Sequence, residues 1–255
     1  MSDNSEIKYK RLNYMDWNNI NKNYWDQISP SYGDLYNDTW SKLEDRFIQN
    51  QLLKIVHNKD KVLDLGCGLC LGYDLICEKR ADIDYTGVDI STKMIEKAKS
   101  KNQKIHVLNS TMSNLSAIAD NSIDVVISIN TSFSYTENIQ KTISEIKRVL
   151  KKNGKIFISV ISKNSFRRIL NLKFGNMEKY STRNTKANSH SYSWVFSTSM
   201  LNRVFKENGF EEIEVKGYNS FGGFFQTNWI WRLNLLLSKI FPNLSHDLIL
   251  TATYK

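Results

Sequence analysis

The chain is poor in the residues that mark several protein classes. Its 255 residues include two prolines and eleven glycines, too few for a collagen-like, proline-rich or linker-dominated protein. The three cysteines, Cys67, Cys70 and Cys77, are an odd number and lie close together, which suits a reducing cytoplasm better than a secreted disulfide framework. No apolar run approaches the roughly 20 residues of a membrane span, and the opening MSDNSEIKYKRLNYMD lacks the apolar core of a secretion signal. We therefore expect a cytoplasmic protein without a transmembrane segment.

Positive charge is concentrated in one short stretch. Of the net charge of +9, residues 162–195 supply +6, from seven Lys and Arg residues and one acidic residue. Clustered charge of one sign attracts and retains the opposite charge, so we expect an anionic partner there. A solvated basic loop is the alternative.

From residue 61 onward, short apolar runs alternate with amphipathic segments. The expected strands are 61–65, 83–88, 105–108, 123–129, 155–161, 212–216 and 248–254. The expected helices between and after them are 70–80, 91–101, 137–151 and 197–208. Asn153-Gly154 provides the left-handed turn that ends the helix 137–151. This alternation predicts an α/β protein with a doubly wound, mostly parallel sheet and helices on both faces.

Three helical patterns lie outside that core. Residues 17–28 and 39–57 precede it, and their apolar positions are expected to cover one edge of the sheet. The segment 228–241, NWIWRLNLLLSKIF, is apolar nearly all round but too short to span a bilayer. We expect a buried helix there, and a helix that rests on a membrane surface or forms a dimer is the alternative.

The strongest local motif is VLDLGCGLCLG, residues 62–72, which leaves a strand, turns on Gly66 and Gly68 and enters a helix. Glycines let backbone amides approach a ligand, and a helix N-terminus favours negative charge. The dinucleotide fingerprint GxGxxG fails, since its third glycine would be Leu71. Asp64, two residues before the first glycine, would also repel a pyrophosphate at this turn, whereas a carboxylate there suits an ammonium group.

A second acidic residue follows the next strand. Asp89 ends YTGVD, 21 residues after Gly68, near the spacing of about 20 at which a βαβ nucleotide site places the acid that accepts both ribose hydroxyls. The alternative is that Asp89 only caps the following helix.

Together these segments resemble the class I, seven-strand S-adenosylmethionine-dependent methyltransferases over residues 24–255. The similar pieces are the D-x-G-x-G turn, Asp89, DNSIDVVIS at 120–128, EIKRVLKKNGKIFISV at 145–160, Gly209-Phe210 and the terminal strand LILTATYK. The resemblance implies a single domain that binds S-adenosylmethionine. Its expected parts are an N-terminal helical lid (1–60), a cofactor-binding core (61–161), a substrate cap inserted after the fifth strand (162–195) and a C-terminal helix and strands (196–255). Two positions depart from the family pattern: Cys70 replaces the third glycine, and Thr111 replaces an acid beside the adenine.

The same resemblance assigns cofactor contacts residue by residue. Those expected around the methionine end, the ribose and the adenine are Tyr32, Asp64, Gly66, Cys67, Gly68, Asp89, Ile90, Thr111, Met112, Asn130 and Thr131.

The cap is expected to hold the acceptor. Arg167, Arg168 and Arg183 are the predicted ligands of a phosphate or carboxylate, and Tyr192 and Trp194 the predicted wall. The candidate bases are His190 in the cap and Tyr135 after the fourth strand. No metal is expected, because the Cys67-x-x-Cys70 pair has no second pair and the four histidines are scattered.

These residues predict methyl transfer to an oxygen or nitrogen of a small anionic metabolite. Natural-product, sugar, phosphorylated or nucleotide-linked intermediates are the expected acceptors, including precursors of a surface glycan. Asn130-Thr131-Ser132-Phe133 is not the Asn/Asp-Pro-Pro-aromatic loop used on base amines and glutamine amides, and no Pro-Cys nucleophile follows a strand. Two alternatives stay open, an RNA methyltransferase of the same fold and a non-catalytic S-adenosylmethionine-binding protein. The oligomeric state is not predicted.

Overall fold

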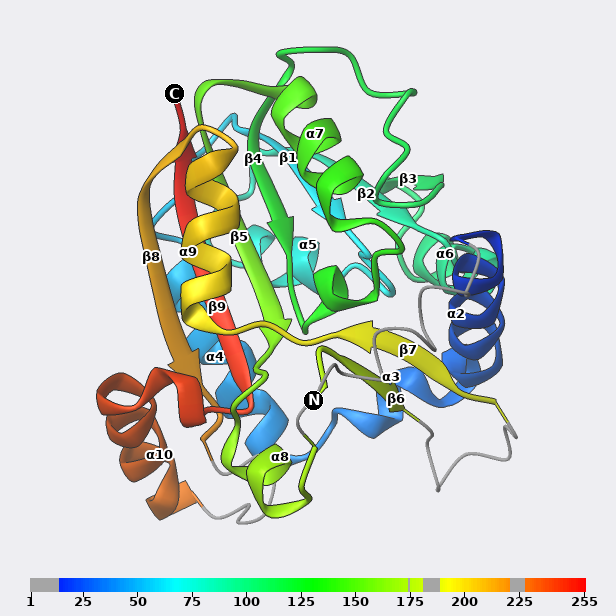
Figure 1. Cartoon of the computed structure of the whole chain (residues 1–255). Coiled ribbons are helices and arrows are strands. Elements are labelled where there is room, and N and C mark those ends of the chain that lie inside the picture. Colours follow the sequence, from blue (N-terminus) through cyan, green and yellow to red (C-terminus); the bar gives the residue numbers. More distant parts are fainter. Residues whose placement is uncertain (1–13, 174, 181–188, 221–227) are drawn as a thin grey trace.

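A seven-stranded sheet runs through the centre of the molecule in the computed structural model, which describes residues 14–173, 175–180, 189–220 and 228–255 (Figure 1). The strand order is β3-β2-β1-β4-β5-β9-β8. The strands are β1 (Lys61–Leu65), β2 (Asp84–Asp89), β3 (His106–Asn109), β4 (Ile123–Ser128), β5 (Leu150–Ile161), β8 (Phe210–Tyr218) and β9 (Asp247–Tyr254). The first five are parallel, and β9 pairs antiparallel with β5 and β8. The predicted doubly wound, mostly parallel sheet is therefore confirmed.

Helices cover both faces of this sheet, as predicted. The face that carries Leu63 and Leu65 packs against α7 (Ile139–Val149) and α9 (Thr198–Glu207). The opposite face, which carries Val62, packs against α4 (Thr39–Leu52), α5 (Leu71–Cys77) and α6 (Thr92–Lys101). Successive β1 residues thus enter two different cores, as the pleat of a strand requires.

The remaining elements gather at the carboxyl ends of the parallel strands (Figure 1). They are α2 (Tyr14–Ile28), η1 (Ser29–Ser31), α3 (Tyr32–Leu35), η2 (Ser132–Tyr135), α8 (Phe166–Leu170), β6 (Met177–Tyr180), β7 (Ser191–Trp194), α10 (Asn228–Ile240) and η3 (Pro242–Leu244). β6 and β7 form an antiparallel pair after β5. Asn21 of α2 exchanges two hydrogen bonds with the backbone of Tyr192 on β7, at 2.9 and 3.0 Å. The N-terminal helix and the insertion after β5 are thereby joined over this edge of the sheet.

Several helices end earlier than the sequence predicts, among them the helix expected over 70–80, which ends at Cys77. The helix expected over 39–57 ends at Leu52. The helix expected over 137–151 ends at Val149, because Leu150 already pairs with Ile123 as the first residue of β5. Asn153 does adopt the left-handed conformation, with φ of +65°, but within the span of β5.

The prediction that residues 228–241 form a helix is confirmed, but the prediction that this helix is buried is wrong. Its inward face consists of Trp231, Asn234 and Ser238, whereas Leu236 and Ile240 are more than half exposed. The inward polar groups are accommodated by local contacts, and the Ser238 hydroxyl lies 2.7 Å from that of Ser220. Within the part of the chain that the structure describes, no helix is long and apolar enough to cross a membrane.

Candidate active site

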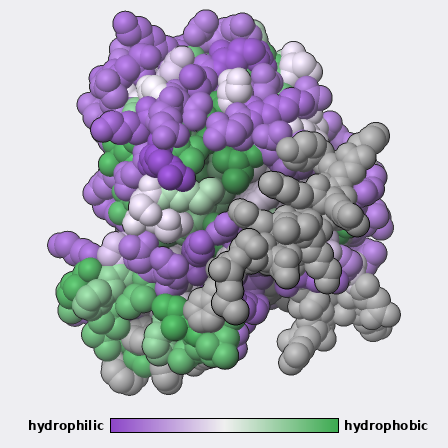
Figure 2. Space-filling model, viewed as in Figure 1, coloured by the Kyte–Doolittle hydropathy of each residue, from purple (hydrophilic) through white to green (hydrophobic). Residues whose placement is uncertain are grey.

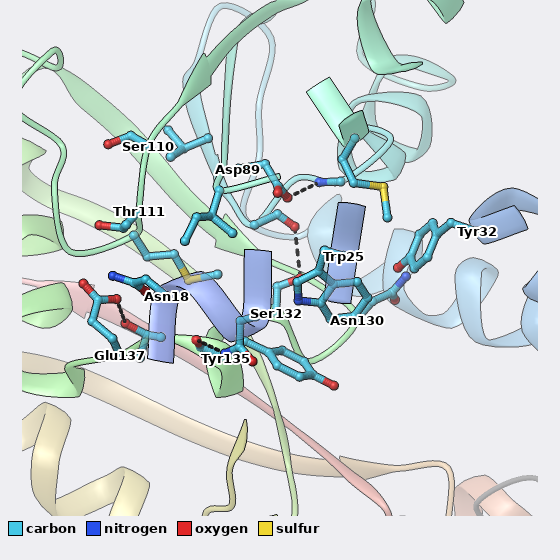
Figure 3. A pocket seen from close by; sticks show the side chains of 18 residues that line it. Asn18, Trp25, Tyr32, Asp89, Ser110, Thr111, Asn130, Ser132, Tyr135 and Glu137 are labelled. Atoms are coloured by element: carbon cyan, nitrogen blue, oxygen red, sulfur yellow. Dashed lines mark hydrogen bonds between the residues drawn. The ribbon is translucent and has the colours of Figure 1, made fainter. Parts of the chain in front are cut away.

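A pocket lies where the loops after β1, β2, β3 and β4 meet α2 and α3 (Figure 3). This is the edge at which open parallel sheets bind ligands. Its lining residues are Asn18, Asn21, Trp25, Tyr32, Gly66, Gly68, Val88, Asp89, Ile90, Met94, Ser110, Thr111, Met112, Asn130, Ser132, Tyr135, Thr136 and Glu137. Eight of the eleven predicted cofactor residues are among them: Tyr32, Gly66, Gly68, Asp89, Ile90, Thr111, Met112 and Asn130.

The turn between β1 and α5 leaves room for a ligand against its backbone. Gly66 and Gly68 have φ of +71° and +52°, a region that glycine enters without steric cost. A Cβ atom at Gly66 would lie 2.6 Å from Met112 Cε, so this position is closed by packing. A Cβ atom at Gly68 would meet nothing within 4 Å, so the space beside this glycine is open to the pocket. Cys70, the departure from the family pattern, adopts a left-handed φ of +61° without being glycine.

Asp89 is fixed at the edge of the pocket by the backbone. Its Oδ2 accepts a hydrogen bond from the Gly68 amide and its Oδ1 from the Ser91 amide, each at 2.8 Å. Burial raises the pKa of this carboxyl to about 6, against the lowering effect of those amides. The side chain that caps α6 is Ser91, which accepts from the Met94 amide. Carboxylate oxygens accept more than one hydrogen bond, so Asp89 has acceptor capacity left for a pair of hydroxyls.

Asp64 does not line the pocket, which corrects the prediction that it meets the methionine end. It points to the same face of β1 as Val62, where its Oδ2 accepts from the Tyr85 hydroxyl at 2.7 Å. A Cβ atom on Gly72 would lie 2.5 Å from the same oxygen. Desolvation raises the pKa of Asp64 to about 7.

Cys67 and Thr131, both predicted to contact the cofactor, are also absent from the pocket lining. The Cys67 side chain packs on Gly87, where a Cβ atom would lie 2.7 Å from its Sγ. The Thr131 amide donates to Ser159 Oγ at 2.6 Å. In both cases the neighbouring residue of the loop, Gly68 or Asn130, faces the pocket instead.

Aromatic side chains from α2, α3 and η2 form one wall of the pocket (Figure 3). Trp25 meets Tyr32 and Tyr135 edge to face, with ring centroids 6.0 and 5.0 Å apart. The Tyr32 phenol hydrogen-bonds with Asn130, and burial raises the pKa of Tyr32 above its usual range. Sequence reasoning found Tyr32 and Tyr135 but missed Trp25. Its helical spacing from Asn18 and Asn21 is the signal that could have revealed a common face.

Tyr192 and Trp194 lie behind this wall rather than in it. Their rings pack on Trp17 of α2, with centroids 5.7 and 5.3 Å away. Trp194 Nε1 also donates to the carbonyl of the lining residue Thr136 at 2.9 Å. His190, one predicted base, contacts Tyr192 edge to face and is absent from the lining. Burial and Lys179 lower its pKa.

Arg168 is committed to internal contacts, which corrects its prediction as a ligand of an anionic substrate. It is buried and pairs with Glu178 at 2.6 Å. Its other guanidinium nitrogens donate to the carbonyls of Lys163, Lys173 and Gly175. Arg167 is exposed, and Arg183 lies outside the described residues.

Across residues 14–173, 175–180, 189–220 and 228–255, no group of three His, Cys, Asp or Glu side chains could hold a metal ion. Cys67 and Cys70 are buried free thiols. A hydrogen bond from Cys67 to Cys70, together with burial, raises the pKa of the Cys67 thiol.

Comparison with known proteins shows similarity over the part of the chain that contributes most of the pocket lining. Residues 63–158 match the family model described as a methyltransferase domain. An uncharacterised protein of Methanocaldococcus jannaschii is 32% identical over 142 residues, which cover 55% of this chain and 51% of that protein. A demethylmenaquinone methyltransferase of Thermotoga maritima is 27% identical over 221 residues, covering 81% of this chain and 95% of the relative. The chain spans about half the length of several of the curated relatives that it matches.

A solved structure extends the likeness of fold beyond the matched segment. The crystal structure of an S-adenosylmethionine-dependent methyltransferase from Thermotoga maritima superposes with a TM-score of 0.57 at 18% identity. The superposition covers 91% of this chain and all of the other. At that identity the likeness concerns the fold. Residues 63–158 thus match the model of a methyltransferase domain, and the fold of the described chain is similar to that of an S-adenosylmethionine-dependent methyltransferase.

Proposed function

We propose that the protein transfers the methyl group of S-adenosylmethionine to an oxygen or nitrogen atom of a small metabolite. The observation that carries this proposal is the pocket at the carboxyl edge of the matched domain, in which Asp89 is held by the amides of Gly68 and Ser91. S-adenosylmethionine, when bound, supplies a methyl group on a sulfonium that leaves readily in a displacement.

The cofactor residues that we propose come from four loops. Asp89 accepts the two ribose hydroxyls, and the open space beside Gly68 takes the methionine part. Ile90, Thr111 and Met112 border the adenine. Asn130, which hydrogen-bonds with Tyr32, joins the lid to the loop after β4. We include the lid (1–60), core (61–161), cap (162–195) and C-terminal part (196–255) in one functional domain.

Positioning is the main catalytic task that we assign to this chain. Holding donor and acceptor in line and away from water can supply a large part of a rate enhancement without a dedicated acid or base. The wall of Trp25, Tyr32 and Tyr135 is suited to that task, since it covers the pocket with apolar surface and two phenols. Tyr135, which lines the pocket, is the base that we retain for an acceptor that must lose a proton.

Turnover tests the proposal directly. The purified protein, S-adenosylmethionine and a panel of small hydroxyl and amine acceptors should yield S-adenosylhomocysteine and a methylated product, measured by mass spectrometry. Asp89→Ala should lower the yield at subsaturating S-adenosylmethionine. Tight binding of S-adenosylmethionine with no product from any acceptor would instead support the non-catalytic alternative.

We further propose that the acceptor is anionic, including a phosphorylated or nucleotide-linked metabolite. The support is the excess of positive charge in residues 162–195. Arg168 is not counted in this support, because its guanidinium already binds Glu178 and backbone carbonyls. Arg183→Ala or Arg167→Ala should lower kcat/KM for an anionic acceptor, with a loss of transition-state stabilisation of about 2–4 kcal/mol. The affinity for the cofactor should not change. Lys206→Ala on α9 is the control for loss of an exposed charge. Full activity of both arginine variants would contradict the proposal that the acceptor is anionic.

A further inference from the structure

Exposed apolar side chains are unevenly distributed over the molecule. Ten large apolar or aromatic side chains are exposed among the described residues, and all but Tyr36 belong to two segments. The nine are Phe166, Ile169, Leu170, Leu172, Leu233, Leu236, Ile240, Phe241 and Leu244. We call them the apolar face. Scattered single exposures are ordinary on soluble proteins, whereas exposed apolar side chains concentrated in two segments indicate an interaction surface.

Both segments lie at the carboxyl edge of the sheet, the edge that also holds the pocket (Figure 1). α8 follows β5, and α10 and η3 precede β9. The Ser162 hydroxyl, just before α8, donates to the Asn243 carbonyl of η3 at 3.0 Å, which ties the two segments together. Figure 2 shows the α10 side of the apolar face as a hydrophobic area at the lower left of the molecule.

α10 buries two polar side chains and exposes several apolar ones. Its side chains toward the protein include Asn234 and Ser238, which are almost fully buried. Its side chains toward solvent include Leu236 and Ile240, which are 52% and 55% exposed. A surface helix normally buries its apolar stripe and exposes its polar one. The outward leucines and isoleucine therefore have no counterpart in the described fold.

The two segments that carry the apolar face contain basic residues and no acidic ones. Arg167 and Lys173 belong to the α8 segment and Arg232 and Lys239 to α10, and neither 163–173 nor 228–244 contains an acidic residue. Lys173 pairs with Glu178, whereas the side chains of Arg232 and Lys239 are exposed beside the outward leucines. A second copy docked on this face about a two-fold axis would bring like charges together.

We propose that the apolar face docks the protein onto an anionic lipid surface. A short helix with apolar side chains on one side and Lys and Arg beside them lies in the plane of a membrane interface, and the basic residues add attraction to anionic headgroups. Docking in this way turns the carboxyl edge of the sheet, and with it the pocket, toward the membrane.

Vesicle cosedimentation of the full chain tests the proposal. The protein should sediment with vesicles of phosphatidylcholine containing 30% phosphatidylserine, and less with phosphatidylcholine alone or at high salt. Leu236→Glu and Ile240→Glu should each weaken partitioning by about tenfold or more, because each removes apolar burial and adds a repelled charge. Gln103→Glu, an exposed position in the turn between α6 and β3, adds a negative charge at the opposite edge of the sheet and should bind as the unaltered protein does. Thermal melting and S-adenosylmethionine affinity of each variant report separately on fold and on the proposed function.

Two results would overturn the proposal. One is an unaltered protein that stays in the supernatant with both kinds of vesicle. The other is a dimer, detected by sedimentation equilibrium, that is lost in Leu236→Glu, together with equal vesicle binding of Leu236→Glu and Gln103→Glu. The second result would assign the apolar face to another copy of this chain.

Discussion

Asp64 shows how a motif can identify a residue without giving the direction of its side chain. The spacing before Gly66 suggests a carboxylate beside the ligand, yet Asp64 is fully buried against Tyr85 and Gly72. Strand alternation already contained this information, because residues two apart on β1, Val62 and Asp64, must share a face. The motif predicted the turn correctly but not the direction in which this side chain points.

The raised pKa of Asp64 has a measurable consequence for stability. Desolvation raises it from an ordinary 3.8 to about 7, so the folded chain holds a proton that the unfolded chain has released. The resulting contribution is fully present below about pH 4 and is lost as the pH rises through about 7. Asp64→Asn stays uncharged, so its free energy of unfolding should fall less between pH 5 and pH 8 than that of the unaltered protein, by about 2 kcal/mol.

Urea unfolding at the two pH values measures this difference. Burial also raises the pKa of Glu44, Asp45 and Asp89, so these groups contribute in the same direction. They are present in both proteins and cancel to first order in the comparison. Parallel pH profiles for the two proteins would show that Asp64 is ionised in the folded state throughout this range.

At the scale of elements, the two glycines of the turn between β1 and α5 should respond differently to substitution. Gly66→Ala places a Cβ atom 2.6 Å from Met112 and 2.7 Å from Ser132, so we expect a loss of stability of about 2–3 kcal/mol from overpacking and positive φ together. Gly68→Ala meets no neighbour within 4 Å, so only the positive φ opposes it, at about 1 kcal/mol.

The Gly66→Ala and Gly68→Ala variants should also differ in their affinity for S-adenosylmethionine. The methyl group at position 68 would occupy open pocket space, so Gly68→Ala should weaken S-adenosylmethionine binding even where it is folded. Thermal denaturation and calorimetry on the same samples give both quantities. An unaltered affinity in Gly68→Ala would mean that the ligand does not approach this side of the turn.

The sequence predicts α10 as a helix but not the face that it buries. Apolar residues occupy most positions of NWIWRLNLLLSKIF, so periodicity does not distinguish one face from another. The orientation depends on contacts with distant residues. Trp231 meets Trp40 edge to face with centroids 5.0 Å apart, and Ser238 meets Ser220. Such contacts exist only after the chain has folded.

For the whole molecule, the sequence predicts the sheet better than it predicts the segments that cover the carboxyl edge of the sheet. Alternating apolar runs and short connections determine the parallel strands, and the loops after them place Gly68 and Asp89 in one pocket. The arrangement of the cover depends on hydrogen bonds between residues far apart in sequence, such as Trp17 Nε1 to the Tyr135 carbonyl at 2.9 Å. Local sequence patterns do not reveal such pairs, which explains why the sequence predicts Trp194 in the pocket, whereas the structure places it behind the pocket wall.

The central claim is that this pocket binds S-adenosylmethionine through Asp89, and calorimetric titration of the apoprotein tests it most directly. The unaltered protein should bind S-adenosylmethionine, and Asp89→Ala should bind it more weakly by about 1–3 kcal/mol, because a charged acceptor for two hydroxyls is lost. Asp74→Ala, the same change on the exposed side of α5, should leave the affinity unaltered. Equal affinities for the Asp89→Ala and Asp74→Ala variants, both folded by thermal melting, would contradict the account.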